Sequence, residues 1–424
     1  MLGKEDEMSQ DAVPRRAWAV VWCTCFLGFA IFSRILCLPP IGNILREALS
    51  ITHSKVGLIF SLPVAILAAT AVPSGLFGDR VGPRRAVGIG MIILAGGSLA
   101  SGTASGFQGL FIYTCIFGIG FSMAFSSLPK LLGQWLPADK VGLATGIYAT
   151  GIAIGGAVSL GITLPVIFPV TNSFRGAFFI WSIPAVIGAA LWWFLVKEYP
   201  SPPSTLEPLS EDDGKGKSFH VWKNRNLWVA SFILFFLNTQ FYTWMGWTPQ
   251  LMIMKGARPE TAALMISFNS WVSIPFTFLI PWISYKVGLV RPFIWLAALG
   301  FMLCAWAAIY IPVSLGWPLM FLLGLLVSIY PLLLALPVDL APREYVGAAS
   351  GMMLSIGYLG ALVGPWLAGF LLDVSGTLSP ALVFLIGSGI ALGGFGIILP
   401  ETGSRSKEPK GVMPTGKTTK AMEM

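Results

Sequence analysis

Long apolar runs, separated by short polar loops, make up most of this chain. Twelve of these runs are roughly 20 residues long or longer. A helix over each run, rising about 1.5 Å per residue, can cross a hydrocarbon layer about 30 Å thick. Within lipid every backbone polar group must find a partner inside its own segment, which favours helices. The predicted spans are residues 17–38, 54–77, 86–104, 107–128, 141–168, 175–197, 227–250, 261–285, 290–311, 316–338, 344–372 and 379–399.

The composition supports a chain that lies in a lipid bilayer. Of its 424 residues, 55% are hydrophobic and 11% are charged, whereas soluble domains carry about 25% charged residues. A transmembrane β-barrel is excluded because the apolar runs are continuous and do not alternate with polar residues. The predicted fold class is therefore an all-α membrane protein with twelve transmembrane helices.

Two stretches of the chain, one in each half, are near-copies of each other. Pro137-Ala-Asp-Lys-Val-Gly-Leu-Ala-Thr-Gly146 recurs as Pro342-Arg-Glu-Tyr-Val-Gly-Ala-Ala-Ser-Gly351, and each copy opens a Gly-rich apolar run. Parallel internal repeats in a hydrophobic chain are typical of secondary transporters, whose substrate site lies between the halves. The repeat predicts two pseudo-symmetric six-helix bundles. Glycines in the fifth and eleventh spans are expected to form packing surfaces between helices.

Polar segments flank and join the two predicted halves. With both termini in the cytoplasm, the inner segments hold 21 of the 27 Lys and Arg residues and the outer loops hold five, as the positive-inside rule requires. This bias predicts a multi-pass protein of the cytoplasmic (inner) membrane. The predicted division is a cytoplasmic N-terminal tail, 1–16; a first bundle, 17–197; a cytoplasmic linker, 198–226; a second bundle, 227–399; and a cytoplasmic C-terminal tail, 400–424.

The loop between the second and third spans carries a motif, Gly75-Leu-Phe-Gly-Asp-Arg-Val-Gly-Pro-Arg-Arg85, with a degenerate copy at Lys286-Val-Gly288 and Arg291. Gly82 and Pro83 favour a tight reversal, because glycine tolerates positive φ and proline fixes its own φ. The motif resembles the signature of the major facilitator superfamily, which implies a latch joining the two halves on the cytoplasmic side. A topology loop with no moving part is the alternative. The latch residues would be Gly75, Asp79, Arg80, Gly82, Arg84 and Arg85.

A second set of segments, spread over both halves, matches a narrower pattern. These segments are Pro129-Lys130, Trp135-Leu-Pro137, Thr145-Gly-Ile-Tyr148, Arg175-Gly-Ala-Phe178 with Trp181, Gln240-Phe-Tyr242, Trp247-Thr-Pro249 with Gly256, Gly357-Tyr358, Gly364-Pro365 and Gly369 to Asp373. They resemble the cyanate permease and 2-nitroimidazole transporter family. The resemblance implies transport of a small anion or a small polar, nitrogen-bearing solute. Two features depart from that family: the first span has Phe32-Ser-Arg34 where Asn-Leu-Arg is usual, and the loop motif is nearly complete.

Arg34 is the one charge clearly inside an apolar run. Burying an unpaired guanidinium costs at least about 2.5–3.5 kcal/mol on insertion scales, and the helical neighbours of Arg34 offer no counter-charge. A bound anion would compensate, which predicts an anion site. The alternative is that the side chain reaches the outer interface. All 19 acidic residues lie in loops, in tails or at span ends, which argues against an embedded carboxylate relay.

The repeat predicts which residues lie opposite Arg34. The offset between the two copies leads from Arg34 to Gln240, and the two positions are expected to face each other across the cavity between the halves. Gln240, Thr243 and Trp244 share one helix face, whose hydrogen-bonding groups would suit a small anion; ordinary aromatic packing is the alternative. Three further candidate substrate residues are Asn238, which lies about a quarter-turn off this face, and Tyr148 and Asn269, for which an interhelical hydrogen bond is the alternative role.

Together these features predict a secondary carrier that moves a small monovalent anion, an organic monocarboxylate or a cyanate-like ion, by alternating access. A proton or a counter-anion would be the coupling partner, and a monomer is expected. The alternatives are an efflux carrier for drugs or metabolites and, by resemblance, an organophosphate or nitrate porter. No nucleic-acid partner, cofactor, metal or enzymatic activity is expected, because the spans lack metal-ligand clusters and nucleophile–base sets, and the basic residues are scattered over short loops.

Overall fold

The computed structural model describes residues 15–199, 221–342 and 345–402, and almost all of them lie in helices. Residues 15–195 form α1 (Arg15–Leu36), α2 (Leu38–Leu49), α3 (His53–Val81), α4 (Pro83–Ser101), α5 (Phe107–Trp135), α6 (Ala138–Ile162), the π-helix η1 (Thr163–Ile167), α7 (Phe168–Thr171) and α8 (Phe174–Leu195). Residues 225–398 form α10 (Arg225–Met254), α11 (Pro259–Val287), α12 (Arg291–Tyr310), the short η2 (Val313–Leu315), α13 (Gly316–Val327), α14 (Tyr330–Leu340), α15 (Val346–Ser375) and α16 (Ser379–Ile398).

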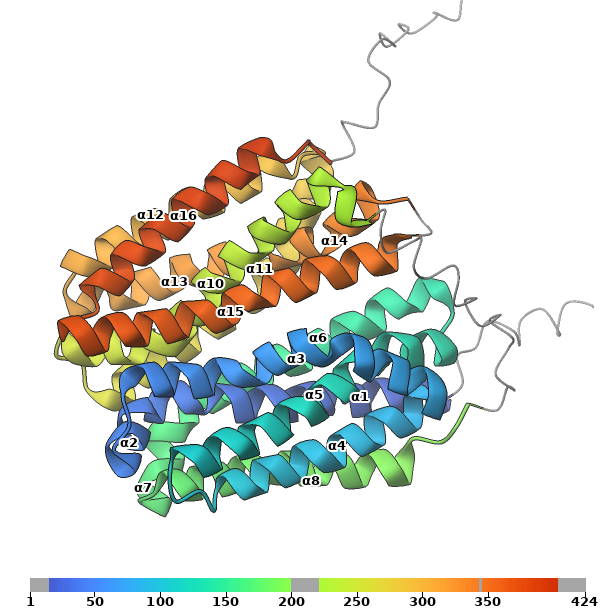
Figure 1. The fold of residues 1–424 in the computed structure, drawn as a ribbon, viewed down its shortest axis with the longest axis horizontal. Coiled ribbons are helices and arrows are strands. Elements are labelled where there is room, and N and C mark those ends of the chain that lie inside the picture. Colours follow the sequence, from blue (N-terminus) through green and yellow to red (C-terminus); the bar gives the residue numbers. More distant parts are fainter. Residues whose placement is uncertain (1–14, 200–220, 343–344, 403–424) are drawn as a thin grey trace, which may run out of the picture.

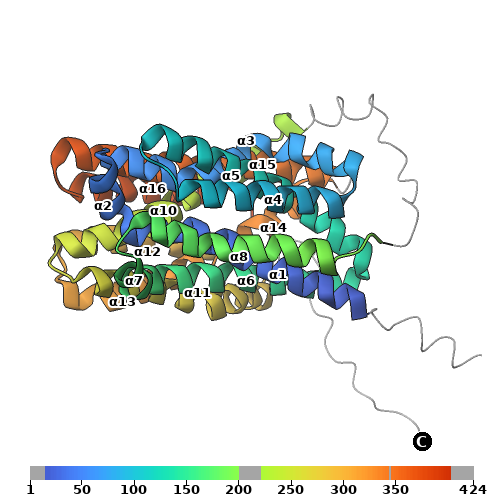
Figure 2. The ribbon, with the colours of Figure 1, turned by 90° about the horizontal axis from the view of Figure 1, so that it is seen from below.

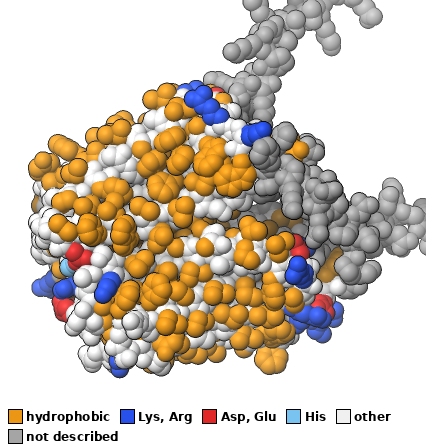
Figure 3. Space-filling model, in the orientation of Figure 1, with side chains coloured by type: hydrophobic (Ala, Val, Ile, Leu, Met, Phe, Trp, Pro, Cys, Tyr) orange, Lys and Arg blue, Asp and Glu red, His pale blue; other side chains and the backbone are white. Residues whose placement is uncertain are grey.

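Ten of the described helical segments are long and apolar enough to cross a membrane, and α13 and α14 together make one of them. Hydrophobic side chains cover the broad face of the molecule, and the charged side chains gather towards its ends (Figure 3). α4 and α10 occupy the two remaining predicted spans. Their hydropathy is lower because α4 carries Arg84 and Arg85 in its first turn, and because α10 carries Asn238 and Gln240. The predicted all-α membrane class is confirmed.

The helices form two sets that lie side by side, α1–α8 and α10–α16 (Figures 1 and 2). Within the first set α1 packs against α6, and within the second α10 packs against α15. Across the boundary α3 packs against α15, and α6 packs against α11. In both sets it is therefore the second and fifth predicted spans that contact the other set, as expected for two pseudo-symmetric bundles.

A glycine with positive φ ends corresponding helices of the two sets. Gly82 caps α3 with φ of 95°, and Gly288, its counterpart in the repeat, caps α11 with φ of 74°. Both values lie in the region that glycine tolerates and other residues avoid. After each turn an arginine ties its helix to the end of the last helix of the set. Arg84 Nε donates to the Val196 carbonyl oxygen at 2.6 Å, and Arg291 Nη2 donates to that of Ile397 at 2.7 Å.

Glycines allow the inner helices to approach at backbone distance. A Cβ at Gly151 of α6 would lie 2.0 Å from the Cys25 carbonyl oxygen of α1. A Cβ at Gly360 of α15 would lie 2.0 Å from the Phe235 carbonyl oxygen of α10. Small residues are what close helix packing in a membrane requires. The predicted Gly-rich packing surfaces of the fifth and eleventh spans are therefore confirmed.

Glycines at the boundary between the two sets are packed closely at one end of the molecule and not at the other. We call the end that carries α2 the distal end and the opposite end, near Arg15, the tail end. Gly57 and Gly75 of α3 are separated by a whole number of helical turns, so they share one face. A Cβ at Gly57 would lie 2.3 Å from the Pro365 carbonyl oxygen across the boundary, whereas one at Gly75, nearer the tail end, would meet no atom within 4 Å.

The facing helix repeats this contrast. Gly351 and Gly369 of α15 have the same spacing as the α3 pair and again share one face. A Cβ at Gly369 would lie 2.6 Å from the His53 carbonyl oxygen, and one at Gly351 would meet nothing within 4 Å. Both helices thus give the same result. The space between the two sets is closed at the distal end and opens towards the tail end.

Some expectations lie outside the described residues. Most of both predicted tails and most of the linker fall in residues 1–14, 403–424 and 200–220, so the domain boundaries remain predictions. The sequence did not predict α2, which follows α1 almost directly and has prolines in its first turn. Proline is well tolerated there, because the first N–H groups of a helix have no intrahelical partner.

Replacing Gly57 with Ala should destabilise the closed distal end by about 1–3 kcal/mol, the usual cost of overpacking, because the new methyl group collides with the backbone of α15. The matched control is Gly75→Ala on the same face of α3, where the methyl group enters open space. Thermal unfolding of the purified proteins in detergent measures the difference. Equal melting temperatures for the two variants would contradict the described boundary.

Candidate functional site

Arg34 lies in the last turn of α1 and is buried, with 5% of its surface exposed. Its guanidinium carbon lies 4.0 Å from the centre of the Phe178 ring on α8 and 5.7 Å from that of Phe117 on α5. This position is inside the first bundle. The guanidinium is therefore held among buried side chains of the first bundle, which weighs against the alternative that it reaches the outer interface.

The contacts of Arg34 leave part of its hydrogen-bonding capacity unused. The two aromatic rings attract a cation, and Nη1 lies 4.0 Å from the Cys37 sulfur. The buried Nε has no hydrogen-bond partner, and no carboxylate of the described residues forms an ion pair with Arg34. A small cavity beside it is lined by Arg34, Thr114 and apolar side chains. The cavity therefore combines a buried cation with a hydroxyl-bearing side chain.

Gln240 does not face Arg34 across the boundary, so that prediction is wrong. Its Nε2 donates a 2.6 Å hydrogen bond to the Leu385 carbonyl oxygen of α16, where Gly389 leaves room for the amide. Phe178, which covers Arg34, and Leu385 occupy nearly equivalent positions in the two halves. Arg34 therefore turns towards Phe178 in the first bundle, and Gln240 turns towards Leu385 in the second bundle. The repeat places Arg34 inside the first bundle and Gln240 at the equivalent position inside the second bundle. The two side chains do not face each other.

Thr243 and Trp244 lie beside Gln240, as their spacing predicts. Both are buried and line a second cavity with Leu382 and Leu385. The Gln240 Oε1, Thr243 Oγ1 and Trp244 Nε1 atoms have no hydrogen-bond partner. The second bundle thus holds a small uncharged cavity with polar groups beside it, separate from the Arg34 cavity.

The other three predicted substrate residues are dispersed. Asn269 Nδ2 donates to the Met320 carbonyl oxygen at 3.0 Å, which is the interhelical bond that the sequence left as its alternative role. Asn238 Nδ2 donates to the Gly357 carbonyl oxygen at 3.0 Å, and its Oδ1 is unpartnered. Tyr148 is buried with an unpartnered hydroxyl group.

Sequence reasoning missed two features of the interior. Tyr330 of α14 and Tyr358 of α15 join their hydroxyl groups at 3.2 Å, and Thr114 of α5 lines the Arg34 cavity. Thr114 belongs to no motif and carries no charge. The run Phe107–Phe125 also carries the hydroxyl groups of Tyr113 and Ser122, so no signal in the sequence singled out Thr114.

The predicted latch residues make their described contacts within the first set of helices. Lys130 Nζ lies 2.6 Å from Asp79 Oδ1, and Arg85 Nε lies 2.7 Å from Glu198 Oε1. Asp79 of α3 thus pairs with a lysine of α5. Arg80 is exposed, and Gly75 faces open space. In this conformation these contacts hold the tail end of the first set together without reaching the second set.

A clasp of backbone and side-chain contacts closes the distal end. The Asp373 carboxylate, on the last turn of α15, accepts hydrogen bonds of 2.8 Å from the backbone N–H groups of His53 and Ser54, at the start of α3. The His53 ring Nδ1 lies 2.8 Å from the same carboxylate. Since the N-terminus of a helix favours negative charge, this carboxylate caps α3 from the other set of helices.

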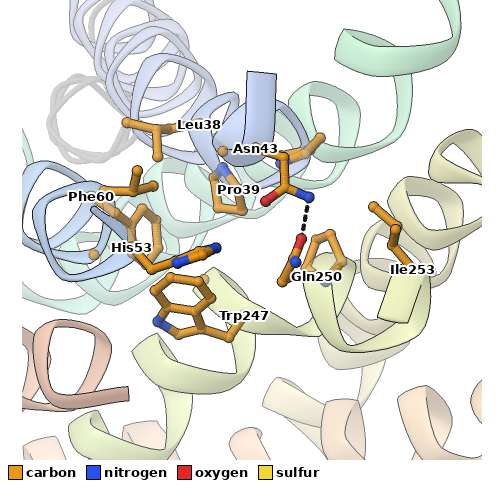
Figure 4. A pocket seen from close by; sticks show the side chains of 14 residues that line it. Leu38, Pro39, Asn43, His53, Phe60, Trp247, Gln250 and Ile253 are labelled. Atoms are coloured by element: carbon orange, nitrogen blue, oxygen red, sulfur yellow. Dashed lines mark hydrogen bonds between the residues drawn. The ribbon is translucent and has the colours of Figure 1, made fainter. Parts of the chain in front are cut away.

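Further contacts seal the boundary beneath this clasp (Figure 4). Asn43 of α2 donates a hydrogen bond to Gln250 of α10, and the His53 ring lies 6.0 Å from that of Trp247. Trp247 is buried, and its Nε1 donates to the Pro365 carbonyl oxygen at 2.9 Å. These residues form the walls of a pocket that both sets of helices share.

A model of the Major Facilitator Superfamily matches residues 21–365 of this sequence. The chain belongs to this superfamily. Its members are transporters, and the chain is accordingly a multi-pass membrane transporter. A bacterial homologue of the human lysosomal transporter Spinster, solved in an inward-facing and unoccupied conformation, superposes with a TM-score of 0.72 at 16% identity, covering 92% of this chain and 96% of that one. This likeness shows the fold.

Curated relatives include three transporters of similar length. The uncharacterized transporter YycB of Bacillus subtilis is 25% identical, over 88% of this chain and 90% of that protein. The 2-nitroimidazole transporter of Escherichia coli is 23% identical, over 81% and 86%. The cyanate transport protein CynX of Escherichia coli is 22% identical, over 80% and 85%. The resemblance inferred from the sequence segments is confirmed, at low identity.

Asp373→Asn should weaken the clasp, because a charged acceptor of hydrogen bonds contributes about 1.5–3 kcal/mol. We expect hydrogen–deuterium exchange to rise in residues 50–62 and 365–376 and to fall at the tail end of α6 as that end closes. The control is Glu260→Gln, which removes a carboxylate at the distal end outside the clasp. If hydrogen–deuterium exchange increases only in residues 53–56, Asp373 caps the start of α3 and has no role in closing the distal end.

Proposed function

We propose that this transporter is a secondary carrier for a small monovalent anion, either an organic monocarboxylate or a cyanate-like ion. The observation that carries the proposal is Arg34, a buried cation with an unpartnered Nε beside a cavity. Carboxylates and similar planar anions are good acceptors for the donor fork of a guanidinium. An anion entering this cavity would meet a charge that no described carboxylate already neutralises.

The charge of the site favours a monovalent substrate. The Arg34 cavity offers one cation, and the equivalent place in the second half holds the uncharged Gln240. A dianion would lack a second positive partner there. The similar protein CynX is named for cyanate, a monovalent anion. This comparison supports the same substrate class, and the burial of Arg34 weighs against an efflux role in which that arginine lies at the lipid interface.

The proposed cycle is alternating access by a monomer in the cytoplasmic membrane, with both termini in the cytoplasm. In that orientation the described conformation is closed outside and open inside. The latch residues would contact the second set of helices when the tail end closes. A proton moving with the substrate or an exchanged anion would drive transport. No catalytic role and no cofactor enter this proposal.

Arg34→Gln should abolish uptake, because truncating one partner of a buried charge pair costs about 2–5 kcal/mol. Arg34→Lys should retain part of the activity, since it keeps the charge and loses the fork. Counterflow of labelled formate or cyanate in proteoliposomes measures the effect, after size-exclusion chromatography has shown normal folding.

The matched control is Arg258→Gln, which removes an exposed distal arginine at the start of α11, in the other set of helices. It should transport like the unaltered protein. If Arg34→Gln transports at an unchanged KM, Arg34 does not bind the substrate and the proposed function is wrong. If the variant loses binding to formate but not to an uncharged solute, the anion role is supported.

A further inference from the structure

Thr114 differs from most threonines in the helices of this protein. A threonine in a membrane helix usually donates its hydroxyl to a carbonyl oxygen in the preceding turn. Thr70, Thr150, Thr163 and Thr248 all do so, at 2.5–2.9 Å. Thr114 is 3% exposed, yet its Oγ1 has no hydrogen-bond partner. Leaving a buried hydroxyl group unpaired costs free energy, so its position calls for a partner.

The side chains that carry the unpartnered Thr114 Oγ1 and the unpartnered Arg34 Nε line one cavity. Arg34 comes from α1 and Thr114 from α5, and the described remainder of the lining is apolar: Ile35, Leu38, Ile59, Phe60, Pro63 and Phe117. Neither polar group can pair with these walls. A ligand bound between them would satisfy both, with the guanidinium supplying charge and the threonine supplying a directed O–H donor.

We infer that Thr114 determines the specificity of the anion site, and that this site lies inside the first bundle between α1, α3 and α5. This inference rests on the proposed function, because it takes the ligand of Arg34 to be the transported anion. Thr114 then donates a hydrogen bond to a second atom of that anion. The ligand class is a small monovalent anion or the carboxylate end of a small organic acid.

The size and walls of the cavity set the selectivity. The free volume that the centre of a water-sized molecule can reach in this cavity is about 10 Å³. That is room for one molecule the size of water. Only the charged end of a substrate therefore enters in this conformation. Phe60 lies at the side towards the second bundle, with its ring 6.1 Å from that of Tyr242. Bulky, strongly hydrated dianions such as sulfate are excluded by size and by the single positive charge.

Two variants that lack the hydroxyl group test this role. Thr114→Val keeps the shape of the side chain, and Thr114→Ala guards against a fold defect in the first variant. We expect both to raise the Kd for formate and for nitrate roughly tenfold to a hundredfold, the loss of one hydrogen bond to a charged group. Thr114→Ser, which keeps the hydroxyl group, should stay within about threefold of the unaltered protein on the same argument.

Isothermal titration calorimetry of the full-length protein in detergent, with formate, nitrate and sulfate as probes, measures these constants. The control is Thr70→Val on α3, whose hydroxyl is bonded within its own helix and whose loss should leave the Kd unchanged. If Thr114→Val and Thr114→Ala bind as tightly as the unaltered protein while Arg34→Gln does not bind, the role of Thr114 is wrong and the proposed function stands. If Arg34→Gln binds normally, the proposed function fails as well.

Discussion

A polar group within a hydrocarbon layer needs a partner, and the rest of this structure depends on that constraint. It makes the backbone helical, because only a helix satisfies its own N–H and C=O groups. It directs most of the helical threonines and serines onto carbonyl oxygens one turn away. Where the constraint is not met, as at Arg34 and Thr114, the unmet capacity points to a ligand. Other buried polar groups of the described residues also lack a partner, and Arg34 and Thr114 are the pair in which a buried cation and a hydroxyl-bearing side chain line the same cavity.

The internal repeat preserves the packing contacts between helices more closely than it preserves the polar residues of the interior. Turns, arginine anchors and glycine contacts recur at equivalent positions in both halves. At one pair of positions the copies diverge: Arg34 lies against Phe178, whereas Gln240 binds the carbonyl oxygen of Leu385. A duplicated scaffold thus carries a charged cavity on one side and an uncharged one on the other. Each cavity is lined by side chains of its own bundle, so neighbouring helices of that bundle fix its geometry.

Much of the fold could be predicted from the sequence, because hydropathy and glycine placement act locally. The spans, the reversal at Gly82 and the close packing at Gly151 follow from residue type alone. The direction of a side chain does not. Whether Arg34 and Gln240 point across the boundary or into their own bundles depends on helix rotation, which residues such as Phe178 and Gly389 decide in three dimensions. Thr114 could not be singled out, because Tyr113 and Ser122 carry hydroxyl groups in the same run and no spacing distinguishes it from them.

The distal clasp has a consequence for which substitutions this protein can tolerate during evolution. Two of its donors are backbone N–H groups, which every residue except proline supplies, so positions 53 and 54 can change without losing those bonds. Its acceptor is a single carboxylate. The evolutionary constraint therefore falls unevenly on the two halves: α3 can accept many substitutions at its start, while α15 must keep one acid at one position. Among related sequences, variation at 53 alongside an invariant acid at 373 is the trace that such a contact would leave.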